Sequence, residues 1–297
     1  MDEHVLAAEE FEQFRPRLRA VAYRMLGSLS EADDAVQDTW LRASRADASG
    51  VENLGGWLTT VAARVCLNML RSRERRREEP LDVHVPDPVI GRELGGDPEQ
   101  EALLADSVGL AMMVVLDSLS PDERLAFVLH DMFAVPFDVI APLLERSPAT
   151  TRQLASRARR RVREQAPAPD PDPARRQEVV DAYLSAARHG DFDALVGVLH
   201  PDIVLRADGG TARARYTTVL RGAQQVAGQA VEAARRLAPF ARPALVNGTA
   251  GVVTVAGGRV VSVMGFTVAG GKIVAIDVLM DPERLARLDL AEFGNGG

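Results

Sequence analysis

Hydrophobic residues recur at intervals of three and four through most of residues 1–165, which is the period of an amphipathic helix. A serine followed by a proline, as at Ser120-Pro121 and Ser147-Pro148, favours a helix start because serine can cap the first turn and proline suits its first position. A Ser-x-x-Asp sequence beginning at Ser30 predicts a further cap. The pattern predicts helices over residues 11–26, 30–43, 54–77, 101–119, 121–131, 137–145 and 148–165. We therefore expect this part of the chain to be entirely helical.

Beyond residue 174 the pattern changes to short valine-rich runs placed between and after two further helices. Gly257-Gly258 and Gly270-Gly271 separate three of these runs and predict two tight hairpin turns. The helices are expected over residues 175–189 and 224–237, and the strands over 203–207, 215–220, 252–256, 260–268 and 272–280. Such a mixture predicts an α+β domain.

Two proline-rich segments divide the chain. Residues 80–101 hold four prolines and three glycines, which is typical of a flexible linker. In residues 166–174 proline alternates with other residues, which predicts a stiff, extended linker. The predicted organisation is two all-α domains at residues 1–79 and 102–165, followed by the α+β domain at residues 175–297.

The helices predicted over residues 137–145 and 148–165 are separated by a short turn, which is helix-turn-helix spacing. The periodicity of the second helix predicts that these residues face the protein: Thr151, Leu154, Ala155, Ala158 and Val162. It places these residues outside: Arg152, Gln153, Ser156, Arg157 and Arg160. Arginine and glutamine side chains can contact base edges in a major groove, while Thr150 and the later arginines suit phosphates. The alternative is a solvated basic helix at a domain edge.

Charge is distributed unevenly along the chain. The formal net charge is -7, yet residues 145–164 carry +5 and residues 64–77 also carry +5. Because the rest of the chain is strongly negative, a polyanion is expected to bind only at these two basic zones. Trp57 precedes the second zone and can either stack on unpaired bases or belong to the core. A solvated helix end is the alternative for that zone.

Asp33, Asp34, Gln37 and Asp38 cluster at helical spacing near a predicted helix start. Carboxylates there are favoured by the helix dipole, and an acidic face can also dock a basic partner. Acid–base catalysis is the third interpretation, although no apolar pocket or metal is indicated beside them. The first two interpretations remain open from the residues alone.

Several classes of protein are not expected. The single cysteine, Cys66, excludes an internal disulfide and suggests a buried thiol in a reducing cytoplasm. The five histidines lack metal-ligand spacing and the glycine pairs lack a phosphate-loop pattern, so we predict no metal and no cofactor. The chain begins without a signal peptide pattern, and its longest charge-free run, residues 243–258, is too short and too rich in glycine to span a membrane.

Residues 11–79, with DDAVQDTWLRA and GWLTTVAARVCLNMLRSRERRR, resemble region two of the extracytoplasmic function sigma factors of bacterial RNA polymerase. Residues 102–165, with LSPDERLAFVLHDMF and the helix-turn-helix, resemble region four of the same family. The resemblance implies a transcription initiation factor that is not an enzyme. Its implied partners are promoter DNA and core RNA polymerase, through the β′ clamp and the β flap.

The same resemblance implies roles for individual residues. Asp33, Asp34, Gln37 and Asp38 would dock on the polymerase clamp. The minus-10 promoter element would be bound by Trp57, Arg64, Asn68, Arg71, Arg73 and Arg75. The minus-35 element would be bound by Thr150, Arg152, Gln153, Ser156, Arg157 and Arg160.

Residues 175–297 resemble a SnoaL-like domain, a cone-shaped α+β fold that a subfamily of these sigma factors carries in place of a separate anti-sigma partner. The resemblance implies regulation in cis. The subfamily has a proline-containing linker motif, an Asp-Gly-Gly-Gly-Lys motif and an Asn-Pro-Asp-Lys-Leu motif. The corresponding residues here are Pro86, Asp87 and Pro88; Asp208, Gly209 and Gly210; and Asp281, Pro282 and Leu285. The linker lacks the usual tryptophan, and the glycine motif lacks its third glycine and its lysine.

We expect residues 86–88 and 281–285 to meet if the third domain folds back. Whether the cone holds a small-molecule ligand is left open. Asp208 or Asp277 on a strand of the cone can act as a general base, and Asp277 is predicted to share a face with Ile273, Ala275 and Leu279. The rival hypotheses are therefore a ligand-responsive helix-turn-helix regulator and a SnoaL-type enzyme joined to a DNA-binding region.

Overall fold

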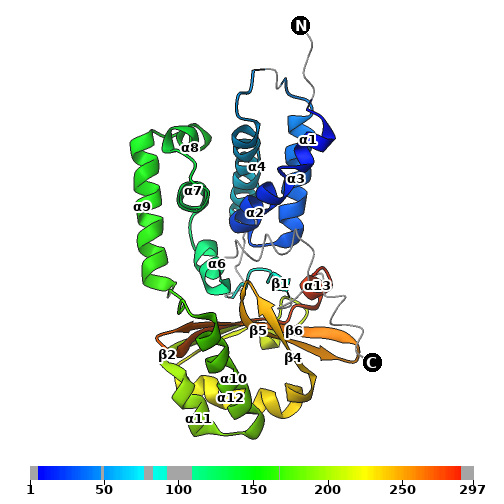
Figure 1. The fold of residues 1–297 in the computed structure, drawn as a ribbon, viewed down its shortest axis with the longest axis vertical. Coiled ribbons are helices and arrows are strands. Elements are labelled where there is room, and N and C mark those ends of the chain that lie inside the picture. Colours follow the sequence, from blue (N-terminus) through cyan, green and yellow to red (C-terminus); the bar gives the residue numbers. More distant parts are fainter. Residues whose placement is uncertain (1–5, 48–49, 77–82, 92–108, 167, 289–297) are drawn as a thin grey trace. The chain divides into compact units, whose positions relative to one another are not determined.

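The computed structural model describes residues 6–47, 50–76, 83–91, 109–166 and 168–288, and these form two compact units (Figure 1). The first unit takes residues 1–79 and 115–165, and the second takes residues 80–114 and 166–297. Both segments predicted as linkers therefore belong to the second unit. Among the described helices, none is long and apolar enough to cross a membrane.

The first unit is helical, as the hydrophobic period predicts. Its N-terminal helices pack around Phe11, Leu18, Val36 and Leu58, each at most 1% exposed. They are α1 (Ala8–Glu12), α2 (Arg15–Leu26), α3 (Leu29–Ala43) and α4 (Leu54–Arg76). The later helices are α7 (Pro121–Phe127), η1 (Val128–Met132), α8 (Phe137–Leu144) and α9 (Pro148–Gln165). Before them, α6 (Leu110–Asp117) crosses from the second unit into the first, because the division between the units lies between residues 114 and 115. The part of the predicted helix 101–119 that precedes residue 109 lies outside the described residues.

Two details of the N-terminal helices differ from the prediction. The single helix expected over residues 11–26 ends at Glu12 and begins again at Arg15, because Pro16 has no N–H to continue the ladder and its ring would meet the carbonyl group of Glu12. The cap of α3 is Ser28 and not Ser30. The Ser28 hydroxyl accepts a hydrogen bond from the Glu31 amide at 3.5 Å.

The predicted caps of α7 and α9 are confirmed. The Ser120 hydroxyl accepts a hydrogen bond from the Glu123 amide, and the Glu123 carboxylate accepts one from the Ser120 amide, each at 3.4 Å. The Ser147 hydroxyl accepts a hydrogen bond from the Thr150 amide at 3.2 Å. Between the two helices of the helix-turn-helix, Glu145 has a φ of 56°, and this left-handed residue turns the chain sharply from α8 into α9.

The second unit is built on a seven-stranded sheet with the order β1-β4-β5-β6-β7-β2-β3. The strands are β1 (Ile90–Gly91), β2 (Leu199–Asp208), β3 (Thr218–Arg221), β4 (Ala241–Val246), β5 (Thr249–Ala256), β6 (Arg259–Ala269) and β7 (Lys272–Leu279). Neighbouring strands are antiparallel except β2 and β7, which are parallel. The predicted α+β class is confirmed.

Three helices cover one face of the sheet: α10 (Pro173–His189), α11 (Phe192–Val198) and α12 (Ala223–Leu237) (Figure 1). Between the helices and the sheet, the Tyr183 ring of α10 meets the Phe266 ring of β6 edge-on, with centroids 5.3 Å apart. Ile203, Val226 and Ile276 are 0% exposed in the same core. A short helix, α13 (Pro282–Leu285), follows β7 and packs near β6.

The sequence pattern did not predict α11, β1 or β4. Pro243 interrupts β4, which for that reason lacks the valine-rich run of its neighbours. The strand forms because all of β4 pairs with β5 on one side. On its other side β1 pairs only with Leu245 and Val246, so Pro243 has no strand partner there and its missing N–H costs no hydrogen bond.

The face predicted for Ile273 is wrong. A register shift between Thr267 and Val268 of β6 places Ile273 in the core with Ile276 and Val278. Asp277, which alternates with Ile276 and Val278 along β7, therefore points to the sheet face opposite the helices.

The segment expected to be a loose linker is partly an ordered component of the second unit. Residues 83–90 are buried except for His84, and Ile90 and Gly91 pair with β4. The Val89 amide donates to the Asn247 side-chain oxygen at 3.0 Å, and the Asn247 amide donates to the Val89 carbonyl oxygen at 2.7 Å. Residues 77–82 and 92–108 lie outside the described residues.

The second predicted linker is also fastened to the sheet. Asp170 accepts hydrogen bonds from the Gly270 and Gly271 amides, both at 2.8 Å, in the turn between β6 and β7. Its own amide donates to the Val268 carbonyl oxygen at 2.8 Å. Both glycines have positive φ, which directs their amides toward one anion. Asp170 thus anchors this segment to the sheet, and the last two residues of the predicted linker, 173–174, already belong to α10.

The Gly271 and Gly270 amides hold the pKa of Asp170 below its usual value. Because the pKa of Asp170 is lower in the folded protein, the anchor stabilises the fold fully at any pH above the unfolded pKa, which is near 3.9. This stabilisation is lost as the pH falls through the lower pKa of the folded protein. We expect the amide NMR shifts of Gly270 and Gly271 to titrate together with a midpoint below 3.9. In Asp170→Asn this titration should disappear. A midpoint at or above the ordinary value would contradict the anchor.

Candidate nucleic-acid interface

The exposed face of α9 is the one that the hydrophobic period predicts. Thr151, Leu154, Ala155, Ala158 and Val162 are buried against the first unit. The side chains on the opposite face are exposed: Arg152, Gln153, Ser156, Arg157 and Arg160. Thr150 is half-buried near the start of the helix. The structure therefore confirms the predicted orientation, and contact with bases or phosphates stays a prediction.

Several arginines of α9 already have partners within the first unit. Arg157 Nε lies 3.3 Å from Glu123 Oε1, and Arg161 Nη1 lies 3.4 Å from Glu123 Oε2. Arg159 Nε lies 2.5 Å from Asp131 Oδ1. The Arg152 guanidinium lies 5.6 Å from the centroid of the Phe137 ring of α8. These contacts orient the basic helix on its own domain before any ligand is bound.

On α4, Trp57, Arg64, Asn68, Arg71 and Arg75 recur at intervals of three, four and seven, so they form one stripe along the helix. We call these five residues the α4 stripe. Arg64, Asn68 and Arg75 are exposed. Trp57 is half-buried and packs against the N-terminal core, so part of its side chain stays exposed.

Arg73 is the one described member of the predicted minus-10 set that lies off this stripe. It forms an ion pair with Glu31 and donates to the Leu26 carbonyl oxygen at 3.0 Å. These contacts tie the end of α4 to the end of α2 and the start of α3. Arg71 is on the stripe and pairs with Asp122 of α7, with 2.9 Å between Nη2 and Oδ1.

The acidic cluster lies on the outer side of α3. Asp33, Asp34 and Gln37 are exposed, and Asp38 is partly so. Arg19 donates to Asp33 at 2.6 Å, and Arg42 donates to Asp38 at 2.8 Å. Because the opposite side of α3 carries Val36 and the half-buried Trp40, the orientation of the cluster is set by the core.

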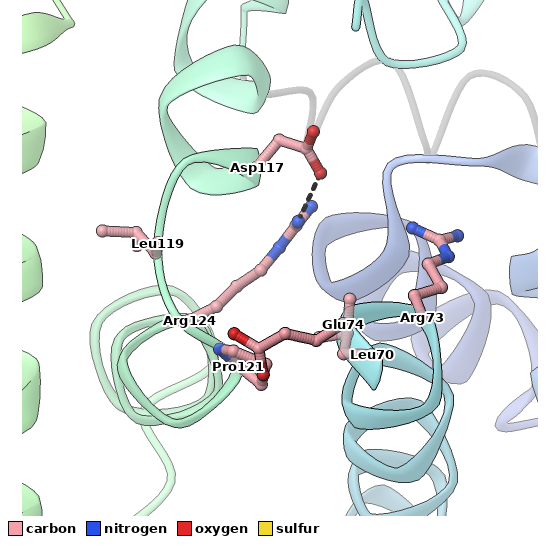
Figure 2. A pocket seen from close by; sticks show the side chains of 7 residues that line it. All are labelled: Leu70, Arg73, Glu74, Asp117, Leu119, Pro121 and Arg124. Atoms are coloured by element: carbon pink, nitrogen blue, oxygen red, sulfur yellow. Dashed lines mark hydrogen bonds and ion pairs between the residues drawn. The ribbon is translucent and has the colours of Figure 1, made fainter. Parts of the chain in front are cut away.

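A small cavity of about 50 Å³ lies between α4 and the segment leading into α7 (Figure 2). Its lining is Leu70, Arg73, Glu74, Asp117, Leu119, Pro121 and Arg124. The Arg124 side chain extends from α7 to Asp117, with 2.9 Å between Nη1 and Oδ1. A volume of this size suits one or two water molecules.

In the second unit, the linker residues and the end of the chain meet at one arginine. Arg284 Nη2 and Nε lie 2.5 and 2.7 Å from Asp87 Oδ1, and Nη1 lies 2.9 Å from Asp208 Oδ2. Arg284 Nη2 also donates to the Val85 carbonyl oxygen at 2.6 Å, and the Val85 amide donates to Asp208 at 3.0 Å. We call this cluster the Arg284 clamp. The expected meeting of residues 86–88 with residues 281–285 is confirmed.

The two carboxylates of the clamp are nearly inaccessible to water, since Asp87 is 5% exposed and Asp208 is 3% exposed. Pro86 and Pro88, on either side of Asp87, are buried as well. His84 Nδ1 lies 3.6 Å from Asp208. A buried carboxylate requires a compensating cation, and Arg284 supplies it to both.

The glycine motif permits a close approach of the chain end. A Cβ atom at Gly210, whose φ is +59°, would lie 2.2 Å from Asp281 Oδ2, and one at Gly209 would lie 2.3 Å from the Arg213 carbonyl oxygen. Asp281 caps α13 by accepting from the Glu283 amide at 2.9 Å. Pro282 begins that helix, and Leu285 is buried beneath it. Asp281, Pro282 and Leu285 thus position Arg284.

Sequence reasoning missed Arg284 and Asn247, the two side chains that hold the linker. Neither belongs to a hydrophobic period. The signal for Arg284 was its place within residues 281–285, the segment expected to meet residues 86–88, where Asp87 offers a carboxylate. The left-handed φ of 49° at Asn247 is a conformation that asparagine tolerates, but the sequence does not show which turn will adopt it.

The two aspartates considered as general bases lie on the sheet face away from the helices. Asp208 alternates along β2 with Ala207 and Leu205 of the helix-covered core. Asp277 is 1% exposed and bonds Arg206 at 3.0 Å across the parallel strands. Burial raises the pKa of Asp277, and Arg206 opposes that rise. Both carboxylates are engaged by arginine.

Comparison with known proteins matches both helical regions and the α+β domain. The family description Sigma-70 region 2 matches residues 11–76, and Sigma-70, region 4 matches residues 110–162. The ECF RNA polymerase sigma factor SigJ of Mycobacterium tuberculosis is 38% identical to this chain over 97% of it and 96% of SigJ. A protein of the same organism named probable ECF RNA polymerase sigma factor SigI is 33% identical over 100% of both chains.

The crystal structure of Mycobacterium tuberculosis SigJ is similar to this one with a TM-score of 0.77 and 36% identity. The match covers 96% of this chain and 100% of that chain. The similarity therefore includes the second unit as well as the helices, and it supports the predicted order of two helical regions and a SnoaL-like domain.

We predict that Arg284→Ala destabilises the second unit by about 3–5 kcal/mol, because it leaves two buried carboxylates without their cation. Urea unfolding followed by far-ultraviolet circular dichroism measures this change, and hydrogen exchange at Val85 should accelerate in parallel. Arg287→Ala, an exposed arginine of the same segment, serves as the control and should shift stability by less than about 0.5 kcal/mol. Equal stabilities of the two variants would show that the clamp contributes little.

Proposed function

This chain belongs to the extracytoplasmic function family of RNA polymerase sigma factors, and from that premise we propose that it binds core RNA polymerase and directs it to particular promoters. The observation that carries the proposal is the exposed face of α9, on which arginine and glutamine follow a tight helix-turn-helix turn. Acting on the polymerase would place the protein in the cytoplasm.

We assign duplex recognition at the minus-35 element to α9. Arg152, Gln153, Ser156 and Arg157 are exposed on the side of the helix that a major groove would meet. Thr150 and Arg160 flank them at positions that suit phosphates. Region four would also dock on the β flap of the polymerase.

We assign the minus-10 element to the α4 stripe. The stripe combines an aromatic edge at Trp57, an amide at Asn68 and the guanidinium groups of Arg64, Arg71 and Arg75. Unstacked bases need an aromatic surface beside a positive backbone track, and the stripe offers both. Because Arg73 faces the other way and binds Glu31, we assign it to positioning α4 and no longer to contact with DNA.

Docking on the β′ clamp is assigned to the acidic face of α3. No ion pair is recorded for Asp34 among the described residues, while Asp33 and Asp38 share their charge with Arg19 and Arg42. Asp34 and Gln37 are therefore the members most available to a basic partner.

Regulation in cis is assigned to the Arg284 clamp. The linker between the two helical regions is part of the sheet domain, through β1 and through the clamp. A state of the SnoaL-like domain that loosens these contacts would free the linker, and a state that tightens them would restrain it. A ligand of this domain is one agent that would change the state.

An enzymatic role receives less support. Asp208 and Asp277 are the candidate bases, yet both face away from the helix-covered side of the sheet and both bind arginine. Their hydrogen-bonding capacity is used in holding the linker and pairing β2 with β7. We therefore propose that the chain acts by binding alone. A ligand-responsive helix-turn-helix regulator is the second candidate, and it would need no polymerase.

Reversing the acidic charge of α3 distinguishes a sigma factor from such a regulator. Asp34→Arg with Asp38→Arg should lower capture of purified core polymerase at least tenfold, because a complementary contact becomes repulsive. Asp193→Arg, an exposed aspartate of the second unit, provides the control. Undiminished capture by the doubly reversed chain would argue strongly against the proposed docking face.

Removing a base contact on α9 should affect sequence preference. We expect Arg152→Ala to weaken binding of the holoenzyme to its own promoter by about 1–3 kcal/mol while leaving binding to unrelated duplexes nearly unchanged. Competition binding at fixed salt measures both affinities. An equal loss on all sequences would identify Arg152 as a phosphate contact.

A further inference from the structure

The first turn of α7 carries two adjacent carboxylates that bind arginines from both proposed DNA-binding surfaces. Asp122 Oδ1 lies 2.9 Å from Nη2 of Arg71, a member of the α4 stripe. Glu123 lies 3.3 Å from Nε of Arg157, on the exposed face of α9. One short acidic segment therefore contacts the arginines expected at the minus-10 and the minus-35 elements.

In each pair the arginine is the more exposed partner. The Asp122 side chain is 25% exposed and that of Arg71 is 39% exposed. For Glu123 and Arg157 the values are 12% and 58%. Glu123 is also fixed by the capping box with Ser120. An arginine on a long, flexible side chain can leave such a pair without any movement of α7.

Arg124, the next residue, fastens α7 to the N-terminal helices. It is 1% exposed, and its Nε donates to the Arg24 carbonyl oxygen at the end of α2 at 3.0 Å. Nη1 binds Asp117, and the Arg124 side chain is one of those that line the cavity of Figure 2. Nη2 is buried without a hydrogen-bond partner among the described residues. Because Arg124 holds α7 against the end of α2, it positions the neighbouring Asp122 within reach of Arg71.

We propose that Asp122 stands in for a promoter phosphate on Arg71 in the free chain, and that DNA must displace it. The inference rests on the proposed role of the α4 stripe. It goes beyond that role because Asp122, a residue of region four, would compete with the DNA that binds the stripe in region two. The carboxylate and the phosphate present similar oxygen acceptors to a guanidinium group.

The physical consequence concerns affinity and salt dependence together. A partly exposed ion pair is weak, so DNA displaces Asp122 without a large penalty. However, an arginine that already holds a carboxylate gains less on meeting a phosphate. Removing the carboxylate should therefore tighten DNA binding. It should also make binding more sensitive to salt, by nearly the amount that one additional phosphate contact causes.

The test uses the full chain with a short single-stranded oligothymidylate as the probe, followed by fluorescence anisotropy over a salt series. Asp122→Asn keeps the size of the side chain and removes its charge. We expect about a threefold to fivefold gain in affinity at low salt, and a log–log salt slope steeper by about 0.7, the value for one added contact to a single strand.

Asp131→Asn is the matched control, because Asp131 also pairs with an arginine, but that arginine is Arg159 of α9 and not a member of the α4 stripe. It should leave binding of the oligonucleotide unchanged. In the Arg71→Ala background, the gain from Asp122→Asn should vanish, since the arginine that benefits is absent. Circular dichroism confirms that each variant is folded.

A gain that persists in the Arg71→Ala background, or an equal gain in Asp131→Asn, would overturn the proposal, because either would reflect overall charge. An unchanged affinity in Asp122→Asn, when the parent chain binds the probe, would overturn it and leave the proposed function intact. If no variant bound DNA even with core polymerase present, the proposed function would fail together with this inference.

Discussion

The contact on which the attachment of the linker to the second unit depends is the guanidinium of Arg284 between two buried carboxylates. Asp87 comes from the segment that joins the helical regions, and Asp208 comes from the edge of the sheet domain. Neither carboxylate is stable in a buried position without a cation, so folding of the sheet domain and placement of the linker become one event. The strand pair of β1 with β4 and the Asn247 contacts extend the same attachment along residues 89–91.

The same pairing of arginine with carboxylate organises the helical unit, where the balance of burial is different. There most of the paired arginines are partly exposed, and we propose that Arg71 exchanges its carboxylate for a phosphate. Arg124 is the exception, because desolvation lowers its pKa and its contacts are structural. The chain thus uses buried pairs to fix its own architecture and exposed pairs to prepare the surfaces that we assign to DNA. This contrast explains how a chain of net charge -7 can present two basic surfaces.

Much of this arrangement could be predicted from the sequence, for reasons that can be stated residue by residue. The period of α9 determined which of its side chains are buried, and the Ser120 and Ser147 caps followed from local chemistry alone. The meeting of Arg284 with Asp87 and Asp208 could not be predicted from the sequence, because it joins residues that are 197 and 76 positions apart in the chain. Pro243 concealed β4, and the register shift in β6 reversed the face of Ile273. Local patterns therefore predicted elements, whereas the long-range pairs that hold the linker required the structure.

The most direct test is run-off transcription with purified core polymerase and a promoter selected by the full chain. We expect Arg284→Ala to change the output in the same direction as deletion of residues 175–297, while Arg287→Ala matches the parent chain. If the parent chain, the Arg284→Ala variant and the shortened chain all gave the same output, the claim that the SnoaL-like domain acts through the linker would be contradicted.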